Sequence, residues 1–534
     1  MFFSVYTLGC KLNQLETEAI TDSFCREGFT FIPWDAGESV SPEHGAAGPS
    51  IMVINTCTVT SMAEQKARRI IRKALKENPG ACLIITGCYA QMEKAALLAL
   101  EAEQSSVEQS SVEQSSVEQS SVEGGRLFVI PGDKKDRIMD LPRYLAGAGV
   151  IPGAGRGGAC FPYRPALPEL IASWLGSFVR IREGEDGAFR FRPENFFSHS
   201  RGFLKIQDGC DNHCAYCRVS LARGKSRSLG AAEVLRELRY LEGRGFAEAV
   251  LTGVNITQYR DSDLAFPGLP GLLDFLLRET GEIRLRLSSV EPDVFTSDQG
   301  AKSFARVLAN PRIRPHFHLS LQSGSASILE KMGRRYMPED IEKTVTLLRS
   351  VREDPFLACD IIAGFPGETE REFEQTRELC ERIDFAWIHA FPYSRRPGTA
   401  AYHFSGKPGE KDAARRTGLL TDLARKGRRD YLGRWEGKEV EAIVEKGNGT
   451  PKCFVPGVSE NYLRLHIAYG GDPAPAPGSL ILCRICRNEV LRNGVPRNPG
   501  RRIDALAEKI RDLRPETHAE AAAQGAWTVN PLEN

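Results

Sequence analysis

Three cysteines lie close together in the run DGCDNHCAYC. Cys210, Cys214 and Cys217 have the spacing CxxxCxxC, and thiolates at this spacing can bind three irons of a 4Fe–4S cluster. The fourth iron is then left without a protein ligand, and an open coordination position is what a catalytic metal site requires. The amino and carboxylate groups of S-adenosyl-L-methionine can occupy that position. Electron transfer from the reduced cluster into the sulfonium then releases a 5′-deoxyadenosyl radical, so the motif predicts radical chemistry.

Zinc is the alternative metal for this loop. His213 could serve as a fourth ligand, but Cys₃His zinc sites usually draw on two separated pairs of ligands. The N-terminal run MFFSVYTLGCKLNQ lacks a basic lead and a cleavage site, so we expect a cytoplasmic protein without disulfides. No apolar run is long enough to predict a membrane span. Eight cysteines are interpreted as buried thiols: Cys25, Cys82, Cys160, Cys359, Cys380, Cys453, Cys483 and Cys486.

A second set of three cysteines is spread over the first hundred residues. Cys10, Cys57 and Cys88 each directly follow an apolar run that predicts a strand, in FSVYTLGC, IMVINTC and LIITGC. Strands of a parallel sheet point the same way, so the residues after them gather at one edge of the sheet. Three thiols at that edge can bind a second three-ligand cluster. The alternative is that each is an ordinary buried thiol.

The elements that would position this second set belong to a domain predicted over residues 1–145. Strands are expected at Phe3–Leu8, Ser50–Asn55, Ala81–Thr86 and Arg126–Ile130, with helices at Asn13–Arg26 and Ser61–Glu77. Alternating strands and helices predict an α/β domain with a doubly wound parallel sheet. Residues 103–122 are four copies of EQSSV, which we interpret as a flexible insertion without chemistry. Residues 146–200, rich in glycine and proline over 152–168, are interpreted as a linker.

A second domain, predicted over residues 201–434, would carry the CxxxCxxC loop. Six strands separated by helical patterns predict an open, TIM-like (β/α)6 partial barrel with its active site at the carboxyl ends of the strands. The expected strands are Phe203–Gln207, Ala249–Thr252, Arg284–Ser289, His316–Gln322, Phe356–Gly364 and Phe385–Tyr393. Residues 435–490 predict a small OB-like β-barrel. The tail at 491–534 is interpreted as irregular.

Two cationic stretches suggest a polyanionic partner, although the net charge is only +1. A run of charges is often just a solvated helix face, and we keep that alternative. Two such stretches near a metal site and a small barrel favour RNA. The first stretch contains Lys66, Arg68, Arg69, Arg72, Lys73 and Lys76. The second contains Lys411, Arg415, Arg416, Arg425, Lys426, Arg428, Arg429 and Arg434.

Several motifs resemble those of the radical-SAM methylthiotransferase family. The segments TLGCKLNQLETE, INTCTVT and TGCYAQ look like the cysteine motifs of that family's N-terminal domain. The loop GCDNHCAYC with ARGKSRS, and the later LTGVN, SSVEP, LSLQSGS and DIIAGFPGET, look like its radical-SAM domain. The terminal segments GKEVEAIVEKGNGT and SENYLRLHI resemble the TRAM module, which binds RNA. The resemblance covers residues 1–490 apart from the EQSSV insertion.

The resemblance implies that an unreactive C–H is replaced by C–S–CH₃, a reaction for which no general base suffices. It implies two 4Fe–4S clusters: one on Cys210, Cys214 and Cys217 that makes the radical, and one on Cys10, Cys57 and Cys88 that supplies or carries sulfur. A second S-adenosylmethionine would methylate that sulfur. Cofactor contacts are expected near the strand ends, at Thr252, Gly253, Ser289, Glu291, Gln322, Gly364 and Pro366.

The resemblance also suggests a substrate and partners. The motif NTCTVT looks like the branch that methylthiolates N6-threonylcarbamoyladenosine at position 37 of tRNA. Arg223, Lys225 and Arg227 could face the carboxylate of that nucleoside. Alternatives are isopentenyladenosine in tRNA, a ribosomal protein side chain, or a non-catalytic iron–sulfur RNA-binding protein. Expected partners are tRNA, an electron donor such as a flavodoxin or ferredoxin, and a sulfur-supplying system.

Overall fold

The chain folds as two units. The N-terminal unit comprises residues 1–197 and 218–225, and the C-terminal unit comprises 198–217 and 226–534. The computed structural model describes residues 1–34, 48–101, 125–150, 166–177, 187–264, 268–447, 453–470, 473–486 and 504–513. The EQSSV insertion at 103–122 and Cys160 lie outside the described residues. No helix in the described part of the chain is long and apolar enough to cross a membrane.

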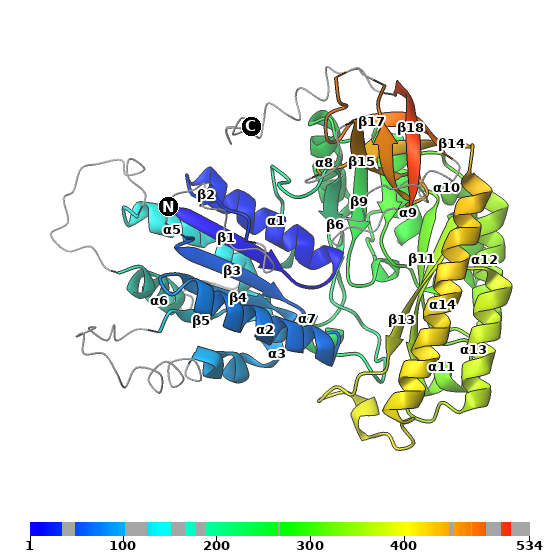
Figure 1. The fold of residues 1–534 in the computed structure, drawn as a ribbon, viewed down its shortest axis with the longest axis horizontal. Helices are drawn as coiled ribbons and strands as arrows, with labels where there is room; N and C mark the ends of the chain where they lie inside the picture. Colours follow the sequence, from blue (N-terminus) through cyan, green and yellow to red (C-terminus); the bar gives the residue numbers. More distant parts are fainter. Residues whose placement is uncertain are drawn as a thin grey trace. The chain divides into compact units, whose positions relative to one another are not determined.

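The N-terminal unit is built on a parallel sheet with strand order β2-β1-β3-β4-β5 (Figure 1). The strands are β1 (Phe2–Thr7), β2 (Thr30–Phe31), β3 (Ile51–Thr56), β4 (Cys82–Gly87) and β5 (Leu127–Val129). Every residue of β3 and β4 is buried, because helices cover both faces of the sheet. This is the doubly wound α/β arrangement that the sequence predicts.

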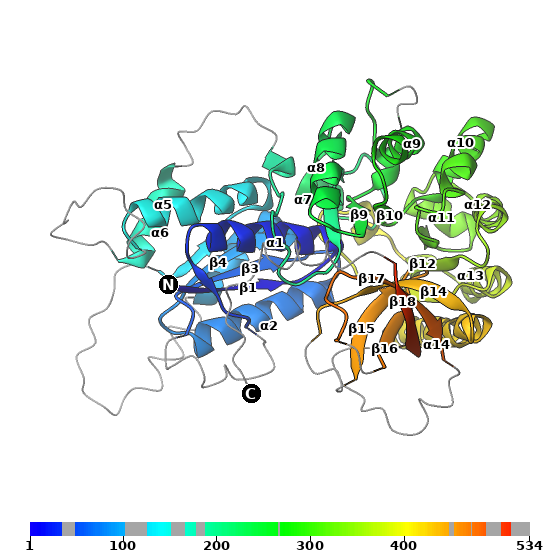
Figure 2. The same ribbon diagram turned by 90° about the horizontal axis from the view of Figure 1, so that it is seen from above.

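Helices pack on the two faces of this sheet as two separate apolar layers (Figure 2). One layer contains α1 (Lys11–Arg26), α5 (Leu141–Gly147) and α6 (Leu167–Ser177). The other contains α2 (Ser61–Glu77) and the short α3 (Cys88–Met92). Helix α2 begins where the Thr60 hydroxyl accepts a hydrogen bond from the amide of Ala63, at 3.1 Å, as an N-cap does.

The predicted linker at 146–200 is wrong for its second half. Helix α6 lies inside it, and Leu170, Ile171 and Trp174 are buried in the same core as Phe3. The side chain of Asn195 also bonds Asp22 at 2.9 Å. The glycine and proline content of 152–168 predicted the linker, but the apolar helical pattern that follows it decides where the chain packs.

The C-terminal unit contains six parallel strands. They are β6 (Gly202–Lys205), β9 (Glu248–Thr252), β10 (Arg284–Leu287), β11 (His316–Gln322), β12 (Phe356–Ala363) and β13 (Trp387–Pro392). They form two sheets, β6-β9-β10 and β11-β12-β13, which are joined by bridges from Leu285 to Ile313 and from Val290 to Leu319. In the described residues β6 and β13 do not pair, so this is the open partial barrel that the sequence predicts.

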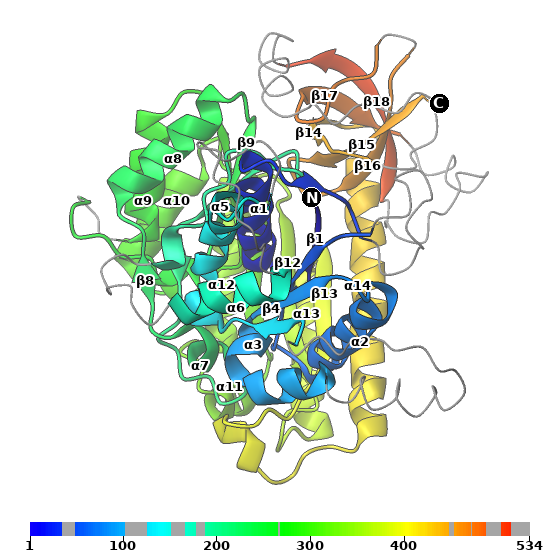
Figure 3. The ribbon, with the colours of Figure 1, turned by 90° about the vertical axis from the view of Figure 1, so that its left-hand side faces the viewer.

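Helices surround these strands on the outside (Figure 2). They are α8 (Ala231–Gly243), α9 (Leu269–Glu279), α10 (Asp298–Leu308), α11 (Ala326–Met332), α12 (Pro338–Val351) and α13 (Glu370–Ile383). Helix α14 (Glu410–Trp435) then packs along β13 and leads into the small barrel (Figure 3). Helix α14 lies so close to the segment before β13 that a Cβ on Gly427 would be only 2.1 Å from the carbonyl oxygen of Phe385.

The small barrel is closed, and part of the predicted tail closes it. Its strands are β14 (Glu439–Val444), β15 (Phe454–Ser459), β16 (Arg464–Ala468), β17 (Leu480–Ile485) and β18 (Ala505–Asp512). Strand β18 lies between β16 and β17. The prediction of an irregular tail over 491–534 is therefore wrong for β18. The segment ALAEKIRD is short and rich in charges, which hid its strand pattern.

A buried ion-pair network joins the small barrel to the partial barrel. Glu248 on β9 bonds Arg286 at 2.6 Å and Arg314 at 2.9 Å, and all three side chains are almost fully buried. Arg314 also bonds Glu441 on β14 at 2.6 Å. Burial alone would raise the pKa of Glu248, but the two guanidinium groups outweigh it and hold the pKa well below its usual range.

Candidate active site

The three early cysteines lie at one edge of the N-terminal sheet. Strands β1, β3 and β4 are neighbours, and Cys10, Cys57 and Cys88 follow their carboxyl ends. Cys10 is the N-cap of α1 and Cys88 is the first residue of α3. Burial raises the pKa of the Cys57 thiol to about 12, and the nearby thiols of Cys10 and Cys88 add to the shift. Cys10 and Cys88 thus both lie near the Cys57 thiol.

Two glycines let the cysteine loops approach one another. Gly9 and Gly87 directly precede Cys10 and Cys88, and their φ angles are +120° and +98°, which side chains rarely adopt. A Cβ on Gly9 would lie 3.3 Å from Sγ of Cys57, and one on Gly87 would lie 2.3 Å from the carbonyl oxygen of Thr56. Neither position has room for a side chain.

Asn13 ties two of these strand ends together. Its Nδ2 donates to the carbonyl oxygens of Leu8, at 2.8 Å, and Thr56, at 3.1 Å. Its Oδ1 accepts a hydrogen bond from Arg223 at 2.9 Å. Arg223 also bonds Glu16 at 3.0 Å, and Glu16 bonds Lys135. This buried network fixes the backbone that carries Cys10 and Cys57.

Arg223 comes from helix α7 (Val219–Arg223), which begins two residues after Cys217 but packs in the N-terminal unit. Arg218 also packs in the N-terminal unit, where it bonds Glu64 at 3.3 Å and Glu93 at 3.0 Å. Because Arg223 is committed to Glu16 and Asn13, it is not the cation that the sequence suggested for a substrate carboxylate. Lys225 and Arg227 are exposed.

The CxxxCxxC loop lies in the C-terminal unit, directly after β6 and the short β7 (Gln207–Asp208). Two donors are directed at its sulfurs. The amide of Asn212 lies 3.4 Å from Sγ of Cys210, and Nη1 of Arg334 lies 3.2 Å from Sγ of Cys214. The amide of Ala215 donates to the carbonyl oxygen of Met332 at 2.9 Å, which anchors the loop to the end of α11.

Donors of this kind stabilise thiolates, which are the form that binds iron. Burial raises the pKa of the Cys210 thiol, and neighbouring Glu291 and Cys214 raise it further. In the described residues no three His, Cys, Asp or Glu side chains converge closely enough to hold one metal ion. A 4Fe–4S cluster is bound differently, since each thiolate binds its own iron. Both sets of cysteines fit such a group.

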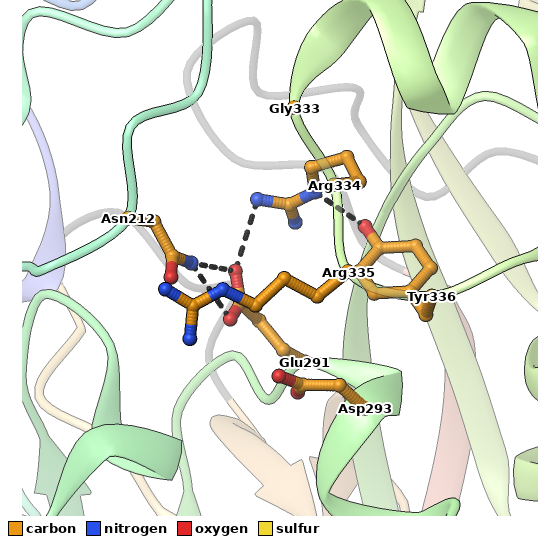
Figure 4. Close-up of a pocket in the computed structure, with 7 residues that line it drawn as sticks. All are labelled: Asn212, Glu291, Asp293, Gly333, Arg334, Arg335 and Tyr336. Carbon is orange, nitrogen blue, oxygen red and sulfur yellow. Dashed lines mark hydrogen bonds and ion pairs between the residues drawn. The ribbon is translucent and has the colours of Figure 1, made fainter.

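A polar pocket adjoins the CxxxCxxC loop (Figure 4). It is lined by Asn212, Glu291, Asp293, Gly333, Arg334, Arg335 and Tyr336. The Glu291 carboxylate accepts from Asn212, at 2.8 and 2.9 Å, and pairs with Arg334 at 2.9 Å. Arg334 also donates to Tyr336, at 2.7 Å, and to the carbonyl oxygen of Ser320, at 2.8 Å.

Arg334 was not predicted, because nothing in the run KMGRRY marks the first arginine as buried. Burial alone would lower its pKa, but Tyr216, Tyr336, Glu291 and Cys214 outweigh burial and hold the pKa well above its usual value. A permanently charged guanidinium thus stands between the pocket and one sulfur of the loop.

Of the seven expected cofactor contacts, Glu291 alone lines this pocket. Thr252, Gly253, Ser289, Gln322, Gly364 and Pro366 lie at or just beyond the carboxyl ends of the strands, as predicted. Gly364 has no room for a side chain, because a Cβ there would lie 2.8 Å from Ala413 on α14. Gln322 has a left-handed backbone, with φ of +69°, which is uncommon outside functional sites.

Comparisons with known proteins agree with this arrangement. Residues 204–380 match the Radical SAM superfamily, and residues 3–108 match a family described as Uncharacterized protein family UPF0004. A protein of Treponema pallidum, named threonylcarbamoyladenosine tRNA methylthiotransferase MtaB, is 37% identical over 90% of this chain and 97% of its own length. The chain belongs to the radical-SAM tRNA methylthiotransferase family. It is an MtaB-like enzyme, which sets aside the non-catalytic alternative, and it uses S-adenosylmethionine and 4Fe–4S clusters.

One further relative and one solved structure are also similar to this methylthiotransferase. A Koribacter versatilis protein, named tRNA-2-methylthio-N(6)-dimethylallyladenosine synthase, is 27% identical over 86% of this chain and 90% of its own length. The radical S-adenosylmethionine methyltransferase TsrM from Kitasatospora setae, solved with cobalamin and a 4Fe–4S cluster, aligns with a TM-score of 0.44 and 16% identity. That alignment covers 75% of this chain and 73% of the other.

The two cationic stretches of this methylthiotransferase differ in their surroundings. On α14, Arg415 and Arg434 form ion pairs with Glu370 and Asp354 of other segments, and Lys426 pairs with Asp430 one turn along the same helix, so part of that charge is already paired. On α2, Lys66, Arg69 and Lys76 are exposed. Next to them Val59 and Met62 are also exposed, close in sequence to Cys57. The α2 surface is therefore the stronger candidate for contact with RNA.

Proposed function

We propose that this enzyme methylthiolates tRNA at C2 of N6-threonylcarbamoyladenosine, the nucleoside at position 37. The observation that carries the proposal is the identity of 37% to the Treponema relative named for that nucleoside, over nearly the full length of both chains. The resemblance of NTCTVT to the same branch supports it. Such an enzyme would act where tRNA is processed, in the cytoplasm.

The six cysteines take two roles in this proposal. Cys210, Cys214 and Cys217 hold the cluster that supplies the electron for cleaving S-adenosylmethionine, and Cys10, Cys57 and Cys88 hold the cluster that supplies or carries sulfur. Support comes from the strand ends that gather each set, and from the donors of Asn212 and Arg334 to Cys210 and Cys214. A flavodoxin or ferredoxin and a sulfur-supplying system are the proposed partners.

The pocket at Glu291 is the proposed site for the methionine end of S-adenosylmethionine. It presents both charges, with Glu291 and Asp293 on one side and Arg334 and Arg335 on the other, which suits a ligand that carries an amino group and a carboxylate. Asn212 and Arg334 orient Glu291 through hydrogen bonds. The strand-end residues Thr252, Gly253, Ser289, Gln322, Gly364 and Pro366 remain proposed contacts to the rest of the cofactor.

A second candidate substrate is N6-dimethylallyladenosine, the isopentenyl nucleoside. The Koribacter relative is named for it, at 27% identity over most of both chains. The two candidates differ in one chemical respect that a protein can detect, since the threonylcarbamoyl group carries a carboxylate and the isopentenyl group is apolar.

A reconstituted assay tests the proposal. The full-length protein, loaded with iron and sulfide without oxygen, is given S-adenosylmethionine, a reductant, and anticodon stem-loops that carry one of the two nucleosides. We expect the methylthio product from the threonylcarbamoyl stem-loop at a rate at least tenfold above that from the isopentenyl one. Preference for the isopentenyl stem-loop would overturn the proposal.

A further inference from the structure

Three strands of the partial barrel share a concave face, on which Tyr431 of α14 packs against Phe356. Along β11, β12 and β13 the less buried side chains fall at alternate positions, including His318, Asp360 and His389. The other alternate positions are buried against the outer helices, as Cys359 is against Cys380 of α13. Since successive side chains of a strand point to opposite faces, His318, Asp360 and His389 face the concave side of the partial barrel.

The small barrel closes one end of this concave face. His316, two residues before His318 on β11, stacks on Tyr462 of the small barrel with ring centroids 4.1 Å apart. Phe356 and Ala358 of β12 belong to the same apolar core as Tyr462 and Tyr431. A ligand therefore enters the concave face from the carboxyl ends of the strands.

The rings of His318, His389 and Phe391 on this face lie nearly parallel to one another, whereas the Trp387 ring stands edge-on to His389 at 79°. Trp387, His389 and Phe391 occupy alternate positions of β13 and form what we call the β13 aromatic cluster. The His389 ring lies 9° from the plane of Phe391, at 6.4 Å, and 3° from that of His318, at 5.2 Å. His389 is exposed, and Phe391 is 41% exposed. Ordered rings that remain exposed on a concave face offer a stacking surface.

Polar neighbours fix the orientation of the two histidines. Nε1 of Trp387 donates to Nδ1 of His389 at 3.3 Å. Nε2 of His318 lies 3.0 Å from Oδ2 of Asp360, close enough for an ion pair when the ring is protonated. These contacts hold the two histidine rings in place on the concave face.

His318, whose ring is parallel to that of His389 in the cluster, lies on β11, and β11 also supports the CxxxCxxC loop. Ser320 follows His318 by two residues on β11, about 7 Å along the strand. Its carbonyl oxygen accepts from Arg334, and Arg334 also donates to Sγ of Cys214. A planar group stacked on the cluster would therefore lie on the concave face, nearer the amino ends of the strands than the CxxxCxxC loop.

We propose that the β13 aromatic cluster, Trp387, His389 and Phe391, binds the target adenine base of tRNA by stacking. An RNA-modifying enzyme must remove its target base from the neighbouring stack, and proteins hold unstacked bases on aromatic rings. The proposal rests on tRNA as the substrate in the proposed function, and it adds a base-binding subsite that does not depend on which group the adenine carries. His389 and Phe391 are exposed and bury little surface, so core packing does not explain them, whereas Trp387 packs against the core of the small barrel.

The test uses the full-length enzyme and an anticodon stem-loop with the fluorescent adenine analogue 2-aminopurine at position 37. Stacking quenches this fluorophore, so wild-type protein should quench it on binding. Phe391→Leu removes the ring but keeps an apolar side chain, and it should abolish most of the quenching and raise KM for tRNA about five- to 150-fold. Phe391→Tyr keeps the ring and should restore both.

A matched control is Tyr240→Leu, which removes an aromatic ring that is also about 40% exposed but lies on the outer helix α8. It should leave quenching and KM unchanged. Iron content and formation of 5′-deoxyadenosine without RNA should be equal in all variants. If Phe391→Leu quenches and reacts like wild type, the subsite is wrong while the proposed function stands. If wild-type protein does not act on the threonylcarbamoyl stem-loop, the proposed function fails, whatever Phe391→Leu does to quenching.

Discussion

At the scale of single residues, the two sets of cysteines differ in what surrounds them. Cys214 accepts a hydrogen bond from Arg334 beside a polar pocket. Cys57 is buried at the sheet edge with Cys10 and Cys88 as its sulfur neighbours. The first environment places charged side chains next to a sulfur, whereas in the second the strand ends bring three sulfurs near one another. This difference predicts that the sets can be inactivated separately.

Cys214→Ala should abolish formation of 5′-deoxyadenosine, and Cys57→Ala should spare part of it while ending sulfur insertion. Wild-type protein reconstituted without oxygen should contain about eight irons and eight sulfides per chain, and each variant about four. Product analysis by mass spectrometry with iron and sulfide assays measures both. Normal cofactor cleavage in both variants would refute the division of roles, and four irons in the wild type would refute the second cluster.

Arg334 is the residue that joins Glu291, Cys214 and Ser320. Its side chain is 5% exposed, so Arg334→Met would leave Glu291 buried beside an apolar group, a costly arrangement. We expect cofactor cleavage to fall at least tenfold. Arg236 on the outer helix α8 provides the control, because its side chain is 66% exposed and Arg236→Met leaves the Glu291 pair intact. That variant should retain most of the activity, and an equal loss in both variants would contradict the role of Arg334.

At the scale of secondary structure, each cysteine set depends on how strands end. The sequence was sufficient to predict β1, β3, β4 and the six strands of the partial barrel, because each is a short run with regularly placed apolar residues that ends in glycine or polar residues. It was insufficient for α7 and Arg218, because their partners Glu16, Glu64 and Glu93 are far away in the sequence. Arg334 escaped prediction for the same reason, since its partners come from three separate loops and strands.

Strand β18 should be essential to the small barrel. It pairs with both β16 and β17, so removing it would leave two unpaired edges and open the core around Ile467 and Ile485. A chain that stops after Ile503 should show rapid proteolysis within 437–486, while a chain that stops after Leu513 should resist like the full-length protein. Equal resistance of the two truncated chains would contradict the role of β18.

Glu248 should stabilise the C-terminal unit in a pH-dependent way. Its pKa is lowered in the folded protein, so its contribution is present above the pKa of the unfolded state, about 4.3, and is lost as the pH falls toward the folded value. Glu248→Gln leaves Arg286 and Arg314 buried without their carboxylate, and should cost about 3–5 kcal/mol. Thermal unfolding at pH 7 measures this. The difference between variant and wild type should shrink in acid, and a constant difference down to low pH would be inconsistent with the ion-pair network.

At the scale of the whole molecule, the described part of the enzyme combines three parts. A doubly wound unit gathers one set of thiols, a partial barrel holds the other set beside a charged pocket, and a closed five-stranded barrel is attached to the partial barrel through Glu248, Arg286 and Arg314. The exposed cations of α2 and the β13 aromatic cluster lie on different units, and each suits a different part of an RNA: the phosphate backbone and an unstacked base.

The most direct measurement of the central claim is the nucleoside profile of tRNA from a strain that lacks this gene, obtained by mass spectrometry beside the parent strain. The account predicts that 2-methylthio-N6-threonylcarbamoyladenosine disappears, that its unmethylthiolated precursor accumulates, and that the methylthio-isopentenyl nucleoside is unchanged. Returning the wild-type gene should restore the product, and returning Cys214→Ala should not. Persistence of the threonylcarbamoyl product together with loss of the methylthio-isopentenyl nucleoside would contradict the account.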